Sequence, residues 1–366
     1  MKIKVSQQSL NKALGIVSRV AAGARTTLPI LNNVLIRANS KKITLTTTNL
    51  DLAAVSFVTG VVENDGVITL PVKVLAEFVS NLPKDEDVLI EVKDEKASIV
   101  SGQYKSTING VSADEFPEIP VLDGKKAVIF RSSADEFKSA VGNVVIASSN
   151  DTTRPVLTGI YTYTYEGGLY MVCTDGYRLA EQKYVSGVES EVNVIIPATS
   201  AHDVLRSLSP ESEEIEIAID ESQVKFSFEE TEIISKLIDG SFPDYKQLIP
   251  KKTEINAVVE KDKLVRDVKL AALFAREVGG SIICETKGTK LMISSVANEL
   301  GENTSEIEVG DVDDGKVTLN SRFLLDVLNV ISDKEVKFGF SSKVSPTVVR
   351  GSKDKDYTYI VMPLKS

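Results

Sequence analysis

Few residues of this 366-residue chain could support nucleophilic or metal chemistry. His202 is the only histidine, and it lies in a helix-like segment, so a Ser-His-Asp or Cys-His arrangement would depend on that one side chain. Cys173 and Cys284 are far apart in the sequence and lack the spacing of zinc ligands. Each lies in an apolar, strand-like run, which predicts two buried free thiols. We therefore expect no histidine-based catalytic site and no zinc site.

Phosphate and calcium sites are not indicated either. The sequence contains neither a P-loop nor the glycine fingerprint of a dinucleotide site. In the acidic run 311–315, DVDDG, the glycine comes too early for an EF-hand loop, so we interpret the run as an Asp-Gly hairpin turn. We expect no cofactor and no metal. An enzyme with a carboxylate pair stays open as an alternative, and it predicts a deep polar pocket.

The composition is that of a soluble globular protein. Hydrophobic residues make up 42% and charged residues 26% of the chain. The net charge of −10 argues against a simple nucleic-acid binder. No apolar run has the length of a signal-peptide core or a membrane span. We expect a cytoplasmic protein that does not contact membranes.

The elements that would position a site recur three times along the chain. An amphipathic helical pattern recurs at 127-residue intervals, in 6–21, 133–147 and 260–275. A strand that leads into a second helix recurs in the same order, in 68–83, 193–210 and 317–332. Alternating strand patterns between Gly, Asp and Asn turns fill the rest of each repeat.

This organisation predicts an α+β fold of three repeated domains, each with two helices packed on antiparallel sheet. We place the domains at 1–124, 125–250 and 251–366. One large mixed α/β domain with accidental similarities is the alternative.

Five short strings give the chain a resemblance to a known family. They are TLPILNNVLI (27–36), TRPVLTGI (153–160), TDGYRLA (174–180), FPDY (242–245) and VMPLKS (361–366). Together with the threefold repeat, they resemble the β subunit of bacterial DNA polymerase III over the whole chain. The resemblance implies a DNA sliding clamp, which is not an enzyme and tethers the catalytic subunit of that polymerase. It also implies a homodimeric ring that encircles double-stranded DNA, with helices lining the hole.

The helical segments, which would line the hole of such a ring and face the DNA phosphates, are more positive than the rest of the chain. Together with Arg276 and Glu277, which directly follow 260–275, the six helical segments hold eleven basic and nine acidic residues, a net charge of +2, so the rest of the chain carries −12. A clamp that slides should avoid tight phosphate contacts and base readout alike. Ordinary solvated helix faces would explain the contrast nearly as well.

The resemblance further implies a hydrophobic cleft between the second and third domains, where polymerases, the clamp loader and other partners dock a short peptide. Apolar walls would receive Leu or Phe anchors, Gly176 would permit a close turn, and Arg178 would line the wall while its head group stays in water. The turn has Tyr177 where the family often has a histidine, and Gln247 stands where a basic residue is common. The implied peptide-binding residues are Leu157, Thr174, Gly176, Tyr177, Arg178, Leu179, Pro243, Leu248, Asn320, Phe323, Val344, Pro346, Ile360, Met362, Pro363 and Leu364.

Contacts to DNA and to a second subunit follow from the same resemblance. The DNA-binding residues would be Arg25, Lys73 and Arg154. At the ring joint, an edge strand over 103–108 would pair with an edge strand of the third domain. The joint residues would be Lys105, Ser106, Ile108, Ala272, Leu273 and Glu299. Ser106 and Ala272 are smaller than the pair expected there. A repeat scaffold that binds proteins without encircling DNA is a further alternative.

Overall fold

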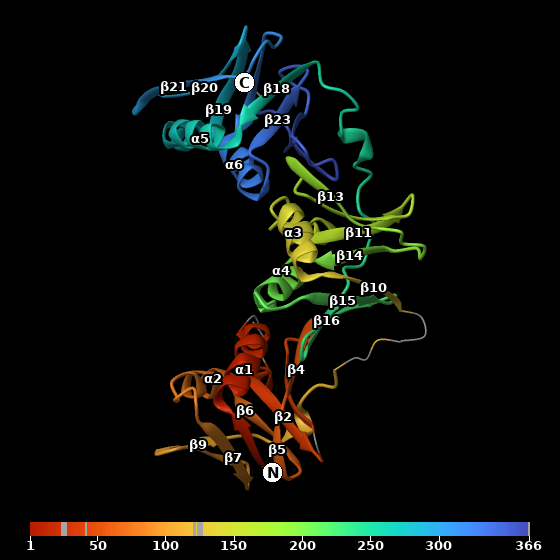
Figure 1. Ribbon diagram of the computed structural model, residues 1–366, viewed down its shortest axis with the longest axis vertical. Helices are drawn as coiled ribbons and strands as arrows, with labels where there is room; N and C mark the ends of the chain where they lie inside the picture. The colour runs from red at the N-terminus through yellow and green to blue at the C-terminus, as the bar shows by residue number, and fades with distance from the viewer. Residues whose placement is uncertain (23–27, 41, 120–121, 123–126, 365–366) are drawn as a thin grey trace. The chain divides into compact units, whose positions relative to one another are not determined.

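A computed structural model describes residues 1–22, 28–40, 42–119, 122 and 127–364 of the chain. The chain divides into two compact units (Figure 1). The first unit contains Met1–Asp135 and Thr199–Leu237, and the second contains Glu136–Ala198 and Ile238–Ser366. In the described part of the chain, no helix combines the length and the apolar character that crossing a bilayer would require.

The first unit contains two antiparallel sheets. Its five-stranded sheet has the order β5 (Gly60–Asn64), β1 (Lys2–Ser6), β7 (Asp87–Lys93), β8 (Lys96–Ser101) and β9 (Tyr104–Asn109). Its eight-stranded sheet has the order β10 (Val128–Ser133), β15 (Glu214–Ile219), β16 (Gln223–Phe228), β17 (Thr231–Lys236), β4 (Leu52–Val58), β3 (Lys42–Thr48), β2 (Asn33–Asn39) and β6 (Gly66–Pro71). The eight-stranded sheet is continuous because β4 of the first repeat pairs with β17 of the second.

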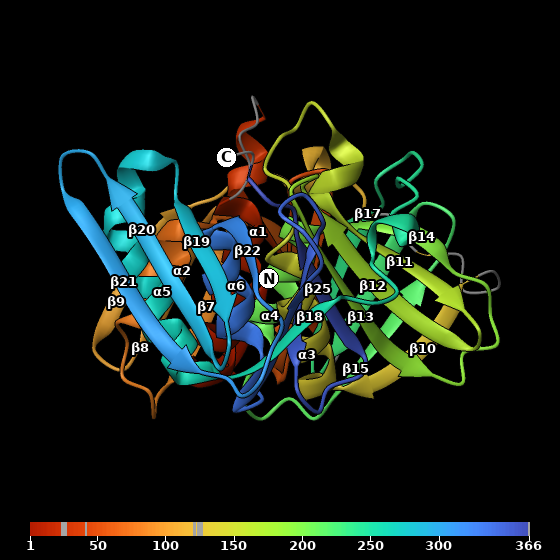
Figure 2. The same cartoon turned by 90° about the horizontal axis from the view of Figure 1, so that it is seen from above.

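The second unit repeats this construction. Its eight-stranded sheet has the order β14 (Asn193–Pro197), β11 (Gly159–Tyr165), β12 (Gly168–Thr174), β13 (Arg178–Ser186), β25 (Tyr357–Val361), β24 (Thr347–Gly351), β23 (Glu335–Phe340) and β18 (Ile255–Glu260). Here β13 of the second repeat pairs with β25 of the third. Its four-stranded sheet has the order β21 (Gly301–Glu308), β20 (Lys290–Ala297), β19 (Ser281–Lys287) and β22 (Gly315–Asn320), as Figure 2 shows in part.

Helices cover one face of these sheets. The described α-helices are α1 (Gln7–Ala22), α2 (Val72–Ser80), α3 (Ala134–Val145), α4 (Ala198–Ser207), α5 (Lys261–Ala275) and α6 (Ser321–Val330). Helix α1 packs beside α2, and α5 packs beside α6 and over β20 and β21 (Figure 2). The buried residues of α5 are Leu264, Val268, Ala271 and Ala275, which is the spacing of one helix face. All six helices were predicted, and the α+β class is confirmed.

Two turns show the repeat in atomic detail, at 48–52 and 174–178. In each turn, the threonine hydroxyl at the first position donates to the carbonyl of the fifth residue, at 3.0 and 2.7 Å. The Asn or Asp at the second position accepts two backbone amides. The third position is left-handed, with φ +79° at Leu50 and +90° at Gly176. Glycine adopts this conformation without strain, so Gly176 permits the close turn as predicted.

The predicted hairpin at 311–315 is wrong. Strand β21 ends at Glu308 and β22 begins at Gly315, but the two strands lie at opposite edges of their sheet. The acidic run therefore belongs to a connection that crosses the sheet, where the Asp314 carboxylate accepts the Gly288 amide at 2.9 Å. Among the described residues, no group of three or more metal-ligating side chains comes together.

The two cysteines are free and buried, as predicted. Cys173 lies in β12 and Cys284 in β19, so both belong to the second unit. Burial raises the pKa of Cys173 far above its usual range and that of Cys284 to about 12. Both thiols therefore stay protonated at neutral pH.

Candidate functional site

The turn at 174–178, between β12 and β13, presents an aromatic side chain to solvent. The Asp175 carboxylate accepts the amides of Tyr177 and Arg178 at 2.9 and 3.0 Å, which fixes the turn. Tyr177 is 63% exposed. Its carbonyl accepts the Met362 amide at 2.8 Å, so the C-terminal segment lies beside the turn.

Arg178 anchors this turn to the third repeat. Its guanidinium lies 2.9 Å from Asp175 and 2.5 Å from Asp326, and its carbon centre is 4.3 Å from the ring centroid of Phe323. The side chain is only 8% exposed, so the expectation that the head group stays in water is wrong. Burial alone would lower the pKa of Arg178, but its hydroxyl and carboxylate neighbours hold that pKa above its ordinary value. The arginine is a permanent buried cation with two counterions.

A buried apolar cluster lies next to the turn. Leu179 pairs with Ile360 across β13 and β25, and both side chains are almost fully buried. Tyr163, Val172 and Tyr245 belong to the same cluster. The partly buried side chains packed against it are Tyr161, Tyr170, Phe242, Ile249 and Val348. The rings of Tyr161 and Phe242 stack at 4.8 Å with an interplanar angle of 10°. Aromatic and aliphatic side chains contribute equally to this cluster, which forms an apolar floor next to the turn.

Hydroxyl groups fix the 242–248 segment onto this floor. The hydroxyls of Tyr163 and Tyr245 are 2.7 Å apart, and Tyr245 donates to the Glu181 carboxylate. Burial, together with Glu181, raises the pKa of Tyr245 far above its usual range, so the hydroxyl stays a donor. Tyr245 therefore positions Pro243 and Leu248, which lie on either side of it in the same segment.

The predicted peptide-binding residues all belong to the second unit. Five are buried: Leu157, Thr174, Arg178, Leu179 and Ile360. Six are partly exposed: Asn320, Phe323, Pro346, Met362, Pro363 and Leu364. Five are exposed: Gly176, Tyr177, Pro243, Leu248 and Val344. The Leu364 amide donates to the Thr318 carbonyl at 2.9 Å, so the tail is also held by β22.

Sequence reasoning missed three residues of this region: Tyr163, Glu181 and Asp326. The alternation of β11 and β13 places Tyr163 and Glu181 on sheet faces, but it does not reveal which segment covers those faces. Tyr245 lies within the FPDY string and was not singled out. Asp326 occupies the same place in α6 as Asp203 in α4, so the repeat marks Asp326 as an equivalent position. The repeat does not indicate that Arg178 is its partner.

The predicted DNA-binding residues that the structure describes belong to different units, Lys73 to the first and Arg154 to the second. Arg25 lies outside the described residues, and Lys73 is exposed in the first turn of α2. Arg154 is exposed, 3.6 Å from Asp151. Its guanidinium is 3.8 Å from the position that a Cβ at Gly176 would take. Arg154 therefore lies beside the 174–178 turn.

The predicted joint residues lie on β9 and around α5. Strand β9 is an edge of the five-stranded sheet, with Lys105 exposed, Ser106 partly exposed and Ile108 buried. On α5, Leu273 is 52% exposed and Ala272 is partly exposed. Glu299 is exposed in the turn between β20 and β21.

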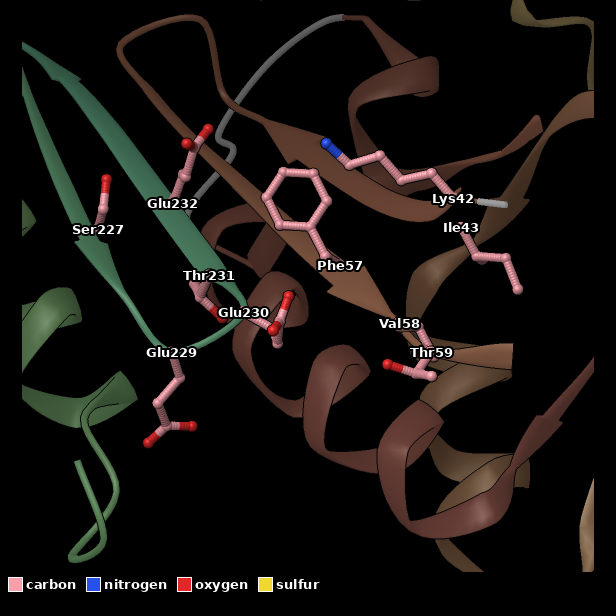
Figure 3. Close-up of a pocket in the computed structure, with 10 residues that line it drawn as sticks. All are labelled: Lys42, Ile43, Phe57, Val58, Thr59, Ser227, Glu229, Glu230, Thr231 and Glu232. Atoms are coloured by element: carbon pink, nitrogen blue, oxygen red, sulfur yellow. The ribbon is translucent and has the colours of Figure 1, made fainter. Parts of the chain in front are cut away.

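A polar pocket of about 460 Å³ lies in the first unit. Figure 3 shows the Lys42 side chain extending over the Phe57 ring, with Glu229, Glu230 and Glu232 contributed by the hairpin of β16 and β17. Burial would raise the pKa of Glu229, but hydrogen bonds from Lys12, Ser212 and Ser209 outweigh it and hold that pKa at about 2.

An ionised carboxylate held in this way cannot serve as a general acid near neutral pH. Glu232 lies 3.4 Å from Lys225, so it too has a cationic partner. Glu229 is therefore not suited to be the acid of an acid–base pair in this pocket.

Comparison with known proteins decides the family. Family models of the DNA polymerase III beta subunit match residues 1–120 with the N-terminal domain, 132–244 with the central domain and 246–365 with the C-terminal domain. The chain belongs to this family. The beta sliding clamp of Synechococcus elongatus is 30% identical, and the match covers 100% of this chain and 99% of that protein. The family is that of a polymerase processivity factor.

Solved structures agree with this membership. The sliding clamp of Bacillus subtilis is 27% identical with a TM-score of 0.94, covering 100% of this chain and 99% of that one. The sliding clamp of Bartonella birtlesii, solved bound to griselimycin, is 29% identical with a TM-score of 0.94 and covers 100% of both chains.

Proposed function

We propose that two copies of this chain close into a ring around duplex DNA and tether the replicative DNA polymerase for processive synthesis. The ring binds DNA topologically, without reading sequence. It has no catalytic activity and requires no cofactor or metal. It acts in the cytoplasm, with the polymerase III catalytic subunit and a clamp loader as partners. Its domains are 1–124, 125–250 and 251–366.

The observation that carries this proposal is the pairing of the repeats. Within the chain, the first repeat joins the second through β4 and β17, and the second joins the third through β13 and β25. The first and third repeats each keep an edge strand, β9 and β21, of the kind that makes those joints. A second copy would pair its own β21 and β9 with these two edge strands. Every repeat would then be joined to a repeat on each side, which is how a closed symmetric assembly forms.

We further propose that partner peptides dock beside the 174–178 turn. The site contains the apolar floor of Leu179 and Ile360, and the exposed Tyr177 and Leu248 border it. Apolar anchors would bury against this floor, and Met362 in the tail would adapt to their shape. Griselimycin, which a relative was solved with, should compete with such peptides.

A release assay tests the topological mechanism. The protein is loaded onto nicked circular plasmid by a clamp loader, and its dissociation is followed before and after the plasmid is linearised. A ring should stay on the circle and leave the linear form quickly. Equal lifetimes on both templates would contradict encirclement and favour a protein-binding scaffold.

A further inference from the structure

One face of the eight-stranded sheet in the first unit carries an apolar pocket of about 280 Å³. Val55 of β4, Ala218 of β15 and Ile234 of β17 line it. Ile129 of β10 also lines it and is 55% exposed, so the pocket has an exposed apolar rim. The pocket belongs to a different unit from Tyr177, so it is not part of the peptide site proposed above.

The pocket is open because the repeats differ at this place. Positions 126 apart correspond in the two joints within the chain, where β4 pairs with β17 and β13 pairs with β25. Glu181 thus stands at the place of Val55, and Tyr245 at that of Ile119. In the second unit Tyr245 is buried and donates to Glu181, so its ring fills the space. In the first unit the shorter Ile119 only lines the pocket.

The polar pocket of Figure 3 adjoins the apolar pocket on the same sheet. Glu232 lines both pockets and lies opposite Val55 across β4 and β17. Two residues along each strand, Phe57 and Glu230 line the polar pocket. Side chains two residues apart on a strand point to the same face, about 6.6 Å from each other. The two pockets therefore form one groove, the Val55–Glu230 groove, which is apolar at one end and acidic at the other.

The acidic end of the groove already holds a cation. The Lys42 Nζ atom lies 3.9 Å from the centroid of the Phe57 ring (Figure 3), which is a cation–π contact. In the second joint Lys183 stands at the place of Phe57. The Phe57 amide donates to the Glu230 carbonyl and the Lys183 amide to the Asp356 carbonyl, both at 2.8 Å. Each joint thus places a cation at the residue next to this acidic side chain.

Glu230 is the carboxylate that remains available to a ligand. The other glutamates of the groove have cationic partners, which are Lys12 for Glu229, Lys225 for Glu232 and Arg131 for Glu216. Glu230 is exposed and makes no ion pair within the part of the chain that the structure describes. Lys42 is exposed as well, so a ligand cation can displace it from the Phe57 ring at little cost.

We infer that the Val55–Glu230 groove binds an extended peptide segment of a partner protein. An apolar side chain of the peptide enters the pocket at Val55, and an arginine or lysine two residues away lies over the Phe57 ring beside Glu230. The spacing fits, because alternate side chains of an extended peptide also lie about 6.6 Å apart on one side. The site lies within one unit and goes beyond the proposed ring, since it requires neither DNA nor a second copy.

Fluorescence anisotropy with a synthetic peptide tests the specificity. The probe is fluorescein-labelled Ser-Gly-Leu-Thr-Arg-Gly-Ser, titrated with the full chain. Peptides with glutamate in place of the arginine, or serine in place of the leucine, should each bind at least about fivefold more weakly. If the serine peptide binds as tightly as the probe, the groove takes a cation alone and the inference is overturned.

Charge reversal in the protein locates the site. Glu230→Lys should weaken binding of the arginine peptide at least about fivefold and make the protein prefer the glutamate peptide. Asp356→Lys, at the counterpart position of the second unit, is the matched control and should bind the probe as the unmodified chain does. A folded Glu230→Lys protein with unchanged preference would overturn the inference.

Two further variants cover the remaining outcomes. If urea unfolding shows that Glu230→Lys is not folded, Glu230→Gln replaces it and must still weaken binding of the arginine peptide. Deletion of residues 362–366 should leave probe binding unchanged. Loss of binding in that truncated protein would place the probe beside Tyr177 and not in the Val55–Glu230 groove.

Discussion

The guanidinium of Arg178 lies 2.5 Å from the carboxylate of Asp326, so one ion pair joins the turn before β13 to helix α6. The same cation also holds Asp175, which shapes the turn. A side chain expected to line a peptide site therefore also fixes the second repeat against the third. Changes at this position should affect stability as well as binding.

Arg178→Lys should lower the free energy of unfolding by about 1–3 kcal/mol. Lysine keeps the positive charge, but it lacks the planar guanidinium that contacts two carboxylates and stacks on the Phe323 ring. Urea unfolding measures the effect. Arg350→Lys, on the exposed side of β24, is the matched control and should leave the midpoint unchanged. Equal midpoints for both variants would mean that the ion pairs add nothing to stability.

Deletion of the last five residues, 362–366, should abolish polymerase stimulation and peptide binding while leaving the dimer intact. The deletion removes the Met362 and Leu364 amides that hold the tail to Tyr177 and Thr318. Primer extension on a loaded circle and sedimentation are the two measurements. A truncated protein that sediments as a monomer would show that the tail belongs to the joint.

Leu273→Asp should convert the dimer to monomer, because an unpaired carboxylate buried at an interface costs several kcal/mol, on the order of 3–5. Leu273 is 52% exposed in the single chain, so the monomer itself should fold normally. Val258→Asp, at a similarly exposed apolar position on β18, should stay dimeric. Sedimentation distinguishes the two; a dimeric Leu273→Asp protein would place the joint elsewhere.

Arg154→Ala should weaken binding to linear duplex and reduce the salt slope by about one, with Arg25→Ala adding to the effect. Once the ring is closed on a circle, its lifetime should barely change, since release then requires the joint to open. Titrations at several salt concentrations and the plasmid release assay measure both quantities. Unchanged duplex binding with reduced peptide affinity would instead assign Arg154 to the turn beside which it lies.

Glu229→Gln should destabilise the first unit at pH 7 by about 1 kcal/mol, a value reduced for partial exposure. The folded pKa of about 2 lies below the ordinary 4.5, so this contribution is present above pH 4.5 and is lost as the pH falls toward 2. Urea unfolding at pH 7 and at pH 3 measures it. Glu230→Gln, at the neighbouring exposed carboxylate, is the matched control and should leave the urea midpoint at pH 7 unchanged.

The sequence predicted the helices and the class of fold because amphipathic spacing is a local property that occurs here in three copies. Burial at Leu264, Val268 and Ala271 follows directly from it. The hairpin at 311–315 failed for the opposite reason. Asp-Gly favours a tight turn locally. The order of strands in the sheet is set by contacts between residues distant in sequence, and these contacts place β21 and β22 at opposite edges despite the local preference.

The site was predictable where it depends on the turn and not where it depends on distant partners. Gly176 could be recognised from the turn itself, since its conformation is local. The partner of Arg178 is Asp326, 148 positions away, and no local pattern links them. The hydroxyl contact between Tyr163 and Tyr245 likewise requires the 242–248 segment to fold back over β11.

The position of the two thiols allows local opening of the second unit to be followed separately from the first. Both cysteines are buried in the second unit, and the first unit has none. A chromogenic thiol reagent such as an aryl disulfide can react only when β12 or β19 opens, so the rate of colour release reports local opening of the second unit and is blind to the first. A peptide bound beside Tyr177 should slow that release. The rate would then report how much of the unmodified protein has peptide bound.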